Sequence, residues 1–215
     1  MFIKSLSLTN YRNYTNVNFE FSSGINILCG KNAQGKTNVA ESIFYLCTGY
    51  SPRATRDKQV IKYGENLANV IGVANSNYGD VEVSIEFTSQ KEKKIKVNGV
   101  PIKKIGELMG NVNSVFFNPS ELKLIKESPE DRRRFMDISI SQMSKKYFFA
   151  LQTYRKILEQ RNLLLKSGDI EVINQTLPLW DIKLAEYAEI IIKERLEFIK
   201  TLTPHAVSAH NYITE

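Results

Sequence analysis

The stretch GKNAQGKT, residues 30–37, decides the fold class of this 215-residue chain. It has the glycine, glycine-lysine and threonine spacing of a phosphate-binding loop, with an apolar run before it (INILC, 25–29) and a helical apolar pattern after it. Glycine lets such a turn aim its backbone amides at phosphate groups, and the positive end of the following helix faces the same anion. The sequence therefore predicts a site for a nucleoside triphosphate.

The loop is expected to bind ATP together with Mg²⁺. Lys36 places a positive charge on the outer phosphates, and the hydroxyl of Thr37 offers one ligand to the metal ion. The other positions contribute mainly backbone amides. The predicted ATP contacts in the loop are Gly30, Lys31, Asn32, Ala33, Gln34, Gly35, Lys36 and Thr37.

Hydrolysis by P-loop proteins also needs an apolar strand that ends in Asp, often followed by Glu, to hold the metal ion and orient water. VFFN (115–118) is apolar but ends in asparagine, and IIIKE (190–194) follows a helical pattern with a lysine before the acid. Neither stretch qualifies, so we assign no catalytic residue. We predict that this 215-residue chain binds ATP without efficient turnover.

Hydropathy patterns predict two lobes of different character. Alternating or continuous apolar runs predict strands at 2–8, 17–21, 25–29, 70–74 and 81–87, and Asn98-Gly99 predicts a tight hairpin within 93–104. After two helix starts at 118–121 and 128–131, apolar residues recur at helical spacing, with a loop at 166–169. The predicted fold class is α/β: a P-loop ATPase lobe at 1–120, with a mixed sheet around the P-loop helix, and an all-helical lobe at 121–215.

The composition excludes several classes of protein. Hydrophobic residues at 42% and charged residues at 24% are typical of a globular protein. The longest aliphatic run, Ile190–Ile192, is far too short to span a membrane, and the N-terminus has no signal-peptide pattern. The two cysteines, Cys29 and Cys47, are expected to be buried thiols in a reducing compartment. We therefore expect a cytoplasmic protein with no membrane partner.

The charge distribution favours a polyanionic partner. The net charge is +6, and residues 91–104 (KEKKIKVNGVPIKK) carry six lysines against one glutamate. A second basic cluster is the arginine run at 132–134. Lysines on a hairpin would bind the phosphates of a nucleic acid without reading its base sequence. The predicted phosphate contacts, which the family resemblance given below assigns to DNA, are Lys93, Lys94, Lys96, Lys103 and Lys104.

Four separated stretches resemble the bacterial RecF family: SLTNYRNY (7–14), GKNAQGKTNVAESI (30–43), SPRATRDKQVIKYG (51–64) and NPSELKLIKESPEDRRRFMD (118–137). The resemblance implies an ABC/SMC-like ATPase head that acts in DNA repair, recombination, replication and the SOS response. It implies binding to single-stranded DNA and to gaps and single-strand/double-strand junctions. It also implies RecO and RecR as partners in loading recombinase, and an ATP-dependent homodimer of the complete protein.

The same resemblance implies further site residues. Arg12 corresponds to an arginine that approaches the nucleotide in related heads, and Asn118 stands where ABC heads place a glutamine. Arg53, Arg56 and Asp57 fall in a segment near the nucleotide edge and dimer face. In the family, a signature serine segment and an Asp-Glu metal strand lie in the second half. We therefore expect this chain to be an N-terminal portion, with ATPase activity a property of the complete protein.

Three other interpretations stay open from the residues. A P-loop nucleotide kinase has about this length, and the arginine run at 132–134 resembles its phosphate-clamping lid, but two strands precede the loop here. A nucleic-acid-binding module without enzymatic activity would explain the basic clusters, although the intact Lys36-Thr37 pair argues against it. Another SMC-like ATPase head is the third.

Overall fold

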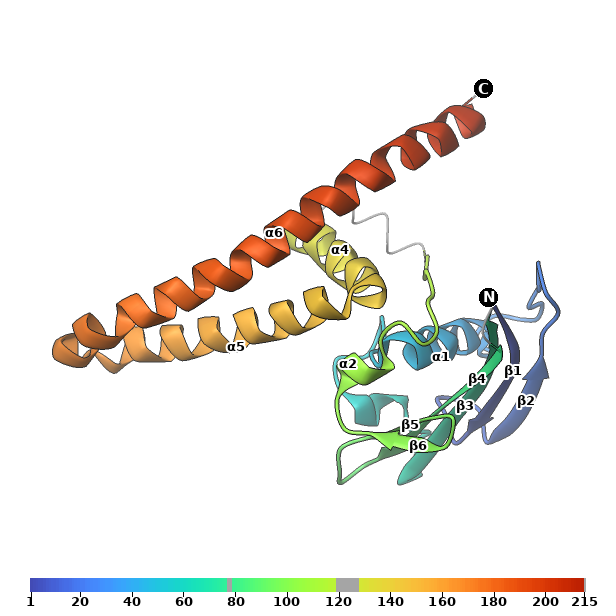
Figure 1. Ribbon diagram of the computed structural model, residues 1–215. Helices are drawn as coiled ribbons and strands as arrows, with labels where there is room; N and C mark the ends of the chain where they lie inside the picture. Colours follow the sequence, from blue (N-terminus) through green and yellow to red (C-terminus); the bar gives the residue numbers. More distant parts are fainter. Residues whose placement is uncertain (77–78, 119–127, 215) are drawn as a thin grey trace. The chain divides into compact units, whose positions relative to one another are not determined.

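The computed structural model describes residues 1–76, 79–118 and 128–214, and the chain divides into two compact units, Met1–Pro119 and Ser120–Glu215 (Figure 1). The boundary predicted between residues 120 and 121 lies outside the described residues. The helix start predicted at 118–121 also lies there, apart from its first residue.

The first unit is built on a six-stranded sheet in the order β2-β1-β3-β4-β5-β6, and every neighbouring pair is antiparallel. Along β3 and β4, buried residues alternate with more exposed ones, because successive side chains of a strand point to opposite faces. One face of the sheet therefore carries the core. The strands are β1 (Phe2–Thr9), β2 (Asn16–Glu20), β3 (Leu67–Ser76), β4 (Gly79–Thr88), β5 (Lys94–Val97) and β6 (Val100–Ile102).

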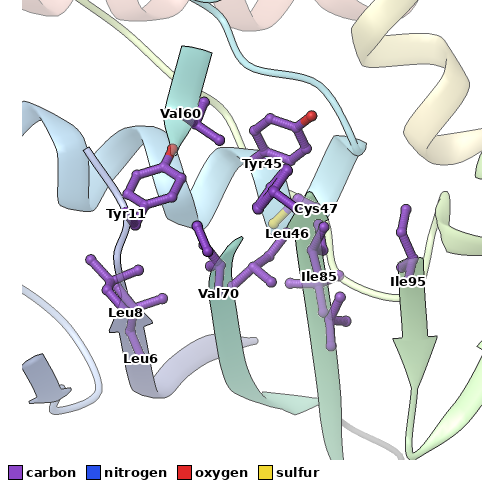
Figure 2. Close-up of a cluster of buried hydrophobic side chains, with 14 of the residues drawn as sticks. Leu6, Leu8, Tyr11, Tyr45, Leu46, Cys47, Val60, Val70, Ile85 and Ile95 are labelled. Carbon is purple, nitrogen blue, oxygen red and sulfur yellow. The ribbon is translucent and has the colours of Figure 1, made fainter. Parts of the chain in front are cut away.

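Helix α1 (Lys36–Thr48) covers the buried face of this sheet. Figure 2 shows its side chains Tyr45, Leu46 and Cys47 packed over residues of the strands. Gly72 on β3 permits the close approach, because a Cβ atom there would lie 2.5 Å from Leu46 Cδ1. The helix ends at Thr48 and is capped by Gly49, which has a φ of 71° and donates its N–H to Tyr45 O.

The predicted hairpin is confirmed as the pair β5 and β6. Asn98 and Gly99 have positive φ values of 49° and 76°, which a type I′ turn requires. The Asn98 side chain accepts a hydrogen bond from the backbone N–H of Glu82, and the Asn98 N–H donates to the Glu82 carbonyl, both at 2.8 Å. The turn is thus fixed to β4. Two short elements lie before β3 and after β6 in the sequence: η1 (Asp57–Val60) and α2 (Ile105–Leu108).

One predicted strand is wrong. Residues 25–29 are not a strand, and the side chains that were expected in the core are exposed, with Ile25 at 89% and Ile27 at 78%. A strand is stable only when a neighbour satisfies its backbone hydrogen bonds, and no described strand pairs with this run. Cys29 is consequently exposed, contrary to prediction, whereas Cys47 is buried and burial raises the pKa of its thiol to about 11.

The second unit contains three described helices: α4 (Pro129–Met143), α5 (Lys145–Ser167) and α6 (Ile170–Thr214). Helix α4 begins at Pro129 after Ser128, as predicted, and Ser144 caps α5 by accepting a hydrogen bond from Tyr147 N–H at 3.2 Å. The predicted loop contains Gly168 at a φ of 73°. Helices α5 and α6 lie side by side and antiparallel (Figure 1), around a core that includes Ile140, Tyr147, Ala150, Leu151 and Ile191.

The helices of both units are too short or too polar to cross a bilayer. This holds for every helix within residues 1–76, 79–118 and 128–214.

Candidate nucleotide-binding site

The phosphate-binding loop leads directly into α1. The helix begins at Lys36, and the backbone N–H groups of Asn38 and Val39 donate to the Gly35 carbonyl at 2.7 and 3.1 Å. The N-terminal end of a helix carries a partial positive charge from its aligned peptide dipoles. The exposed residues 30–34 therefore lie beside an electropositive helix end.

Lys36 folds back across the loop. Its Nζ donates hydrogen bonds to the carbonyl oxygens of Gly30 and Lys31, at 2.7 and 2.8 Å. The ammonium group therefore lies at the rim of the turn formed by residues 30–35. Thr37 lies next to it, at the start of the helix. These positions bring all the predicted loop contacts together in one turn.

Gly35 can only be glycine, for two reasons. Its φ of 102° lies in the left-handed region that side chains disfavour. A Cβ atom would also lie 2.7 Å from Asn13 Oδ1 and 2.7 Å from the Tyr14 hydroxyl. The turn that contains Asn13 and Tyr14 is thus packed directly on the loop. A hydrogen bond of 2.8 Å from Asn38 Nδ2 to Asn13 Oδ1 holds the turn against the first turn of α1.

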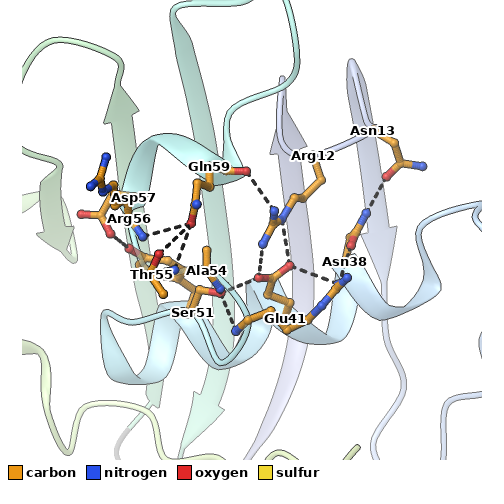
Figure 3. A network of polar contacts seen from close by, with 12 residues as sticks. Arg12, Asn13, Asn38, Glu41, Ser51, Ala54, Thr55, Arg56, Asp57 and Gln59 are labelled. Atoms are coloured by element: carbon orange, nitrogen blue, oxygen red, sulfur yellow. Dashed lines mark hydrogen bonds and ion pairs between the residues drawn. The ribbon is translucent and has the colours of Figure 1, made fainter. Parts of the chain in front are cut away.

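Arg12 belongs to the same turn and is held by a buried glutamate (Figure 3). Arg12 Nε and Nη2 donate to the two carboxylate oxygens of Glu41 at 3.0 and 2.5 Å, and Nη1 donates to the Gln59 carbonyl at 2.9 Å. Burial by itself lowers the pKa of Arg12, but the hydrogen bonds and charge of Glu41 raise it above its ordinary value. The guanidinium therefore stays charged in a fixed orientation.

A second arginine and a serine complete this network. Arg53 Nη1 donates to Asn38 Oδ1 at 2.9 Å and lies 3.6 Å from Glu41 Oε2. Ser51 Oγ donates to the other oxygen of Glu41 and accepts from the backbone N–H groups of Arg53 and Ala54. Glu41 is completely buried. Sequence reasoning missed it, although an acid within the apolar pattern of α1, between two segments with predicted site arginines, was a usable signal.

The lysines predicted to contact DNA differ in exposure, and Lys93 is the one that is largely buried. Lys93 Nζ donates to Gly49 O at 2.7 Å and to the Tyr45 hydroxyl at 3.0 Å, and it pairs with Asp57 at 3.0 Å. It also lies over the rings of Tyr45 and Tyr50, and its side chain is only 13% exposed. Lys93 therefore makes internal contacts, unlike the exposed lysines of the hairpin.

The remaining predicted contacts keep their exposure. Lys94 pairs with Glu86 at 2.9 Å but is 66% exposed, because that pair lies on the surface of the sheet. The other predicted contacts, Lys96, Lys103 and Lys104, are exposed as well. Residues 132–134 are exposed on α4. Asn118 is half-buried at the last described position of the first unit, and its role at the nucleotide stays a prediction.

Comparison with known proteins defines the class. The chain belongs to the AAA domain family, whose model matches residues 5–203. A solved structure of an SMC ATPase, described for ATP-driven dimerization and DNA-stimulated activation, matches 64% of this chain and 98% of its own at 22% identity, with a TM-score of 0.53. This likeness concerns the fold alone, and it confirms the ABC/SMC-like P-loop fold class.

Particular relatives narrow the class. The chain is 45% identical over 214 residues to the DNA replication and repair protein RecF of Clostridium botulinum (strain Eklund 17B / Type B), and 43% identical over 216 residues to that of Ruminiclostridium cellulolyticum. Both matches span 100% of this chain but only 59% and 58% of those relatives. A solved structure of the recombination mediator protein RecF-ATPrS in the RecFOR pathway matches 94% of this chain at 36% identity, with a TM-score of 0.87, and 55% of that protein is covered. The resemblance to RecF is thereby confirmed.

Proposed function

We propose that this chain is the ATP-binding portion of a RecF-type DNA replication and repair protein. The observation that carries the proposal is the position of Lys36, whose ammonium spans the turn of residues 30–35 beside the N-terminus of α1. A cation and a helix end converge on one small volume, which is the arrangement that binds a polyphosphate. A solved RecF-ATP structure matches 94% of this chain with a TM-score of 0.86, which supports ATP as the ligand.

The residues fit a triphosphate with Mg²⁺. On binding, Lys36 Nζ would exchange its two carbonyl partners for the outer phosphates, which gives a charge-assisted hydrogen bond to an anion in place of bonds to neutral groups. The Thr37 hydroxyl lies at the helix start and suits a hard cation that keeps most of its ligands as water and phosphate oxygens. Mg²⁺ would neutralise phosphate charge there. Arg12, held next to the loop, is the proposed additional contact.

Turnover and assembly belong to the proposal for the complete protein. The sequence offers no apolar strand ending in Asp, so we propose that residues 1–215 hold ATP without efficient hydrolysis. The ATP-dependent homodimer, the partners RecO and RecR, and the cytoplasmic location are proposed from the similarity to RecF proteins. The solved relative described as part of the RecFOR pathway supports this assignment.

We also propose that DNA binds through the exposed lysines at the hairpin, Lys94, Lys96, Lys103 and Lys104. Such contacts go to phosphates, so they are salt-dependent and insensitive to base sequence. Single-stranded DNA and junctions are the proposed substrates by similarity to RecF. The two functions involve different residues of the first unit, and they can be tested separately.

Lys36→Ala tests the nucleotide site. A charge-assisted hydrogen bond is worth about 1.5–3 kcal/mol, so the dissociation constant for ATP, measured by titration calorimetry, should rise about tenfold or more. The control is Lys200→Ala, which removes an exposed lysine from α6. Equal ATP affinity in the wild-type chain and Lys36→Ala would refute the site.

The DNA proposal is tested by the salt dependence of binding. Replacing Lys96, Lys103 and Lys104 by alanine should flatten the slope of log K against log salt by about 0.9 for each duplex phosphate that the protein no longer neutralises. Replacing the exposed residues Lys156, Lys193 and Lys200 gives a control with the same change in net charge. The same slope in both triple variants would remove the hairpin from the interface.

A further inference from the structure

A single carboxylate organises the polar groups next to the phosphate-binding loop. Glu41 is completely buried, and its two oxygens accept hydrogen bonds from Arg12 and Ser51, with Arg53 within ion-pair distance. A buried charge is costly unless it is paired and hydrogen-bonded, so this carboxylate requires these partners. In turn, the Glu41 carboxylate holds the side chains of Arg12 and Ser51 in place through these hydrogen bonds.

The network connects three segments that surround the loop. Arg12 comes from the turn that packs on Gly35, Glu41 from α1, and Arg53 from the segment that follows α1. Figure 3 shows Arg12 and Ser51 joined to the Glu41 carboxylate, with Asn38 joined to Asn13. Since Arg53 also donates to Asn38, the residue after Thr37 is fixed from two sides.

The orientation of Arg12 follows from this arrangement. Glu41 binds its guanidinium through two nitrogens, and Gln59 O binds the third. Arg12 also interacts with the Tyr11 hydroxyl, but a guanidinium carries more N–H groups than these contacts use, so a donor is left for a phosphate. A flexible arginine would lose side-chain entropy on contacting a phosphate, whereas this one is already ordered.

We propose that Glu41 is a positioning residue of the nucleotide site, which raises ATP affinity by fixing Arg12 beside the loop without touching the nucleotide. The inference rests on the proposed function, because it names how that site is organised. A purely structural ion pair would contribute to the stability of the fold alone. Glu41 is proposed to contribute to ATP affinity as well, and to do so through Arg12.

A double-mutant cycle tests this path. Glu41→Gln keeps the size of the side chain and removes its charge, and Arg12→Ala removes the guanidinium. Each single variant should raise the dissociation constant for ATP about tenfold, and the double variant should bind no more weakly than Arg12→Ala alone, because residues acting through one another are not additive. Thermal unfolding of every variant, followed by circular dichroism, ensures that affinity is measured on folded protein.

Two further variants keep the test decisive. Asp137→Asn alters another buried carboxylate that two arginines hold, in the second unit, and should lower thermal stability without changing ATP affinity. Should Glu41→Gln fail to fold, Ser51→Ala removes one bond from the same carboxylate and keeps both arginines, and it should weaken ATP binding by a smaller factor in the same direction.

The outcomes separate this inference from the proposed function. If the wild-type chain binds ATP no better than Lys36→Ala, the proposed nucleotide site itself fails. If Lys36→Ala loses affinity while folded Glu41→Gln, or folded Ser51→Ala in its place, binds ATP like the wild type, only the positioning role of Glu41 is overturned. Multiplicative losses in the double variant would also overturn it, since Glu41 would then act independently of Arg12.

Discussion

Each of the two units contains a buried carboxylate that accepts hydrogen bonds from arginine and from a hydroxyl. In the first unit, Glu41 is held by Arg12, whose side chain is 21% exposed, and is approached by Arg53, which is 47% exposed. In the second, Asp137 is held by Arg195, 21% exposed, and Arg155, 57% exposed. The hydroxyls come from Ser51 and Tyr147.

The two networks differ in what they hold together. Asp137 on α4 joins Arg155 on α5 to Arg195 on α6, so it ties three helices of one bundle. Glu41 instead ties a turn and an irregular segment to the helix that begins at the phosphate-binding loop. A buried ion pair is therefore no indication of function by itself. The groups next to the pair make the difference, and of these two carboxylates it is Glu41 that has a ligand-binding loop beside its arginines.

The largest expected effect comes from removing either carboxylate. Glu41→Ala and Asp137→Ala leave two cations without their shared partner, and breaking a buried pair in this way costs about 3–5 kcal/mol of the free energy of unfolding. Glu41 should cost more, because its side chain has no solvent exposure whereas that of Asp137 has 9%. Urea denaturation measures both. Trp180, the only tryptophan in the sequence, reports the second unit by fluorescence.

If either variant lost less than about 0.5 kcal/mol of the free energy of unfolding, as expected of a surface substitution, its arginines would have to be hydrated by water in place of the carboxylate. The comparison would then fail as well, since the two networks would not be structurally equivalent.

Features of the fold that depend on interactions between residues close in the sequence could be predicted, whereas those that depend on residues far apart in the sequence could not. The loop at 30–37, the Asn98-Gly99 turn and the start of α4 at Pro129 follow from local rules of backbone geometry, and the sequence predicts each of them. Residues 25–29 have the composition of a buried strand, but a strand also needs a neighbour, which local sequence does not contain. This is why the prediction was wrong there.

The candidate site shows the same division. The spacing of the loop residues predicts them as nucleotide contacts, whereas Glu41 cannot be predicted in this way, because its burial depends on segments 10–15 and 51–59, which tertiary structure brings over α1. The charge pattern of the sequence groups Lys93 with its neighbours. Its position over Tyr45 and Tyr50 results from packing between the sheet and the end of α1. Charge runs in sequence do not distinguish an internal lysine from an exposed one.

A smaller effect is expected from removing the hydroxyl of each network. Ser51→Ala should cost about 2–3 kcal/mol, because Ser51 Oγ donates to a buried carboxylate and also accepts from two backbone N–H groups. Tyr147→Phe should cost about 1–2 kcal/mol, since its hydroxyl donates to Asp137 and accepts from Arg195. Burial and the hydrogen bond to Asp137 raise the pKa of Tyr147, so the hydroxyl remains a donor. The opposite order of the two losses would mean that the backbone contacts of Ser51 contribute nothing.

The smallest effect is expected where the same kind of pair lies in water. Lys4 on β1 and Asp80 on β4 pair at 2.7 Å, with side chains 47% and 44% exposed. The hydrogen bond from Lys4, and then that from Asn75, lowers the pKa of Asp80 below its ordinary value of 3.8. Because the pKa is lower in the folded chain than in the unfolded chain, the ionised carboxylate favours folding. Its contribution is fully present above 3.8 and is lost as the pH falls through the folded pKa.

Asp80→Asn should therefore lower the free energy of unfolding slightly at neutral pH and not at all once the pH is well below 3.8. Added salt should also reduce the difference between the two proteins, because salt weakens the attraction between exposed charges. At about 1 M salt the Debye length is only about 3 Å. Paired urea titrations of the two proteins at both pH values, with and without salt, measure the difference. A loss as large as that of Asp137→Ala would show that solvent exposure does not set the strength of these pairs, and the contrast between buried and exposed carboxylates would have to be abandoned.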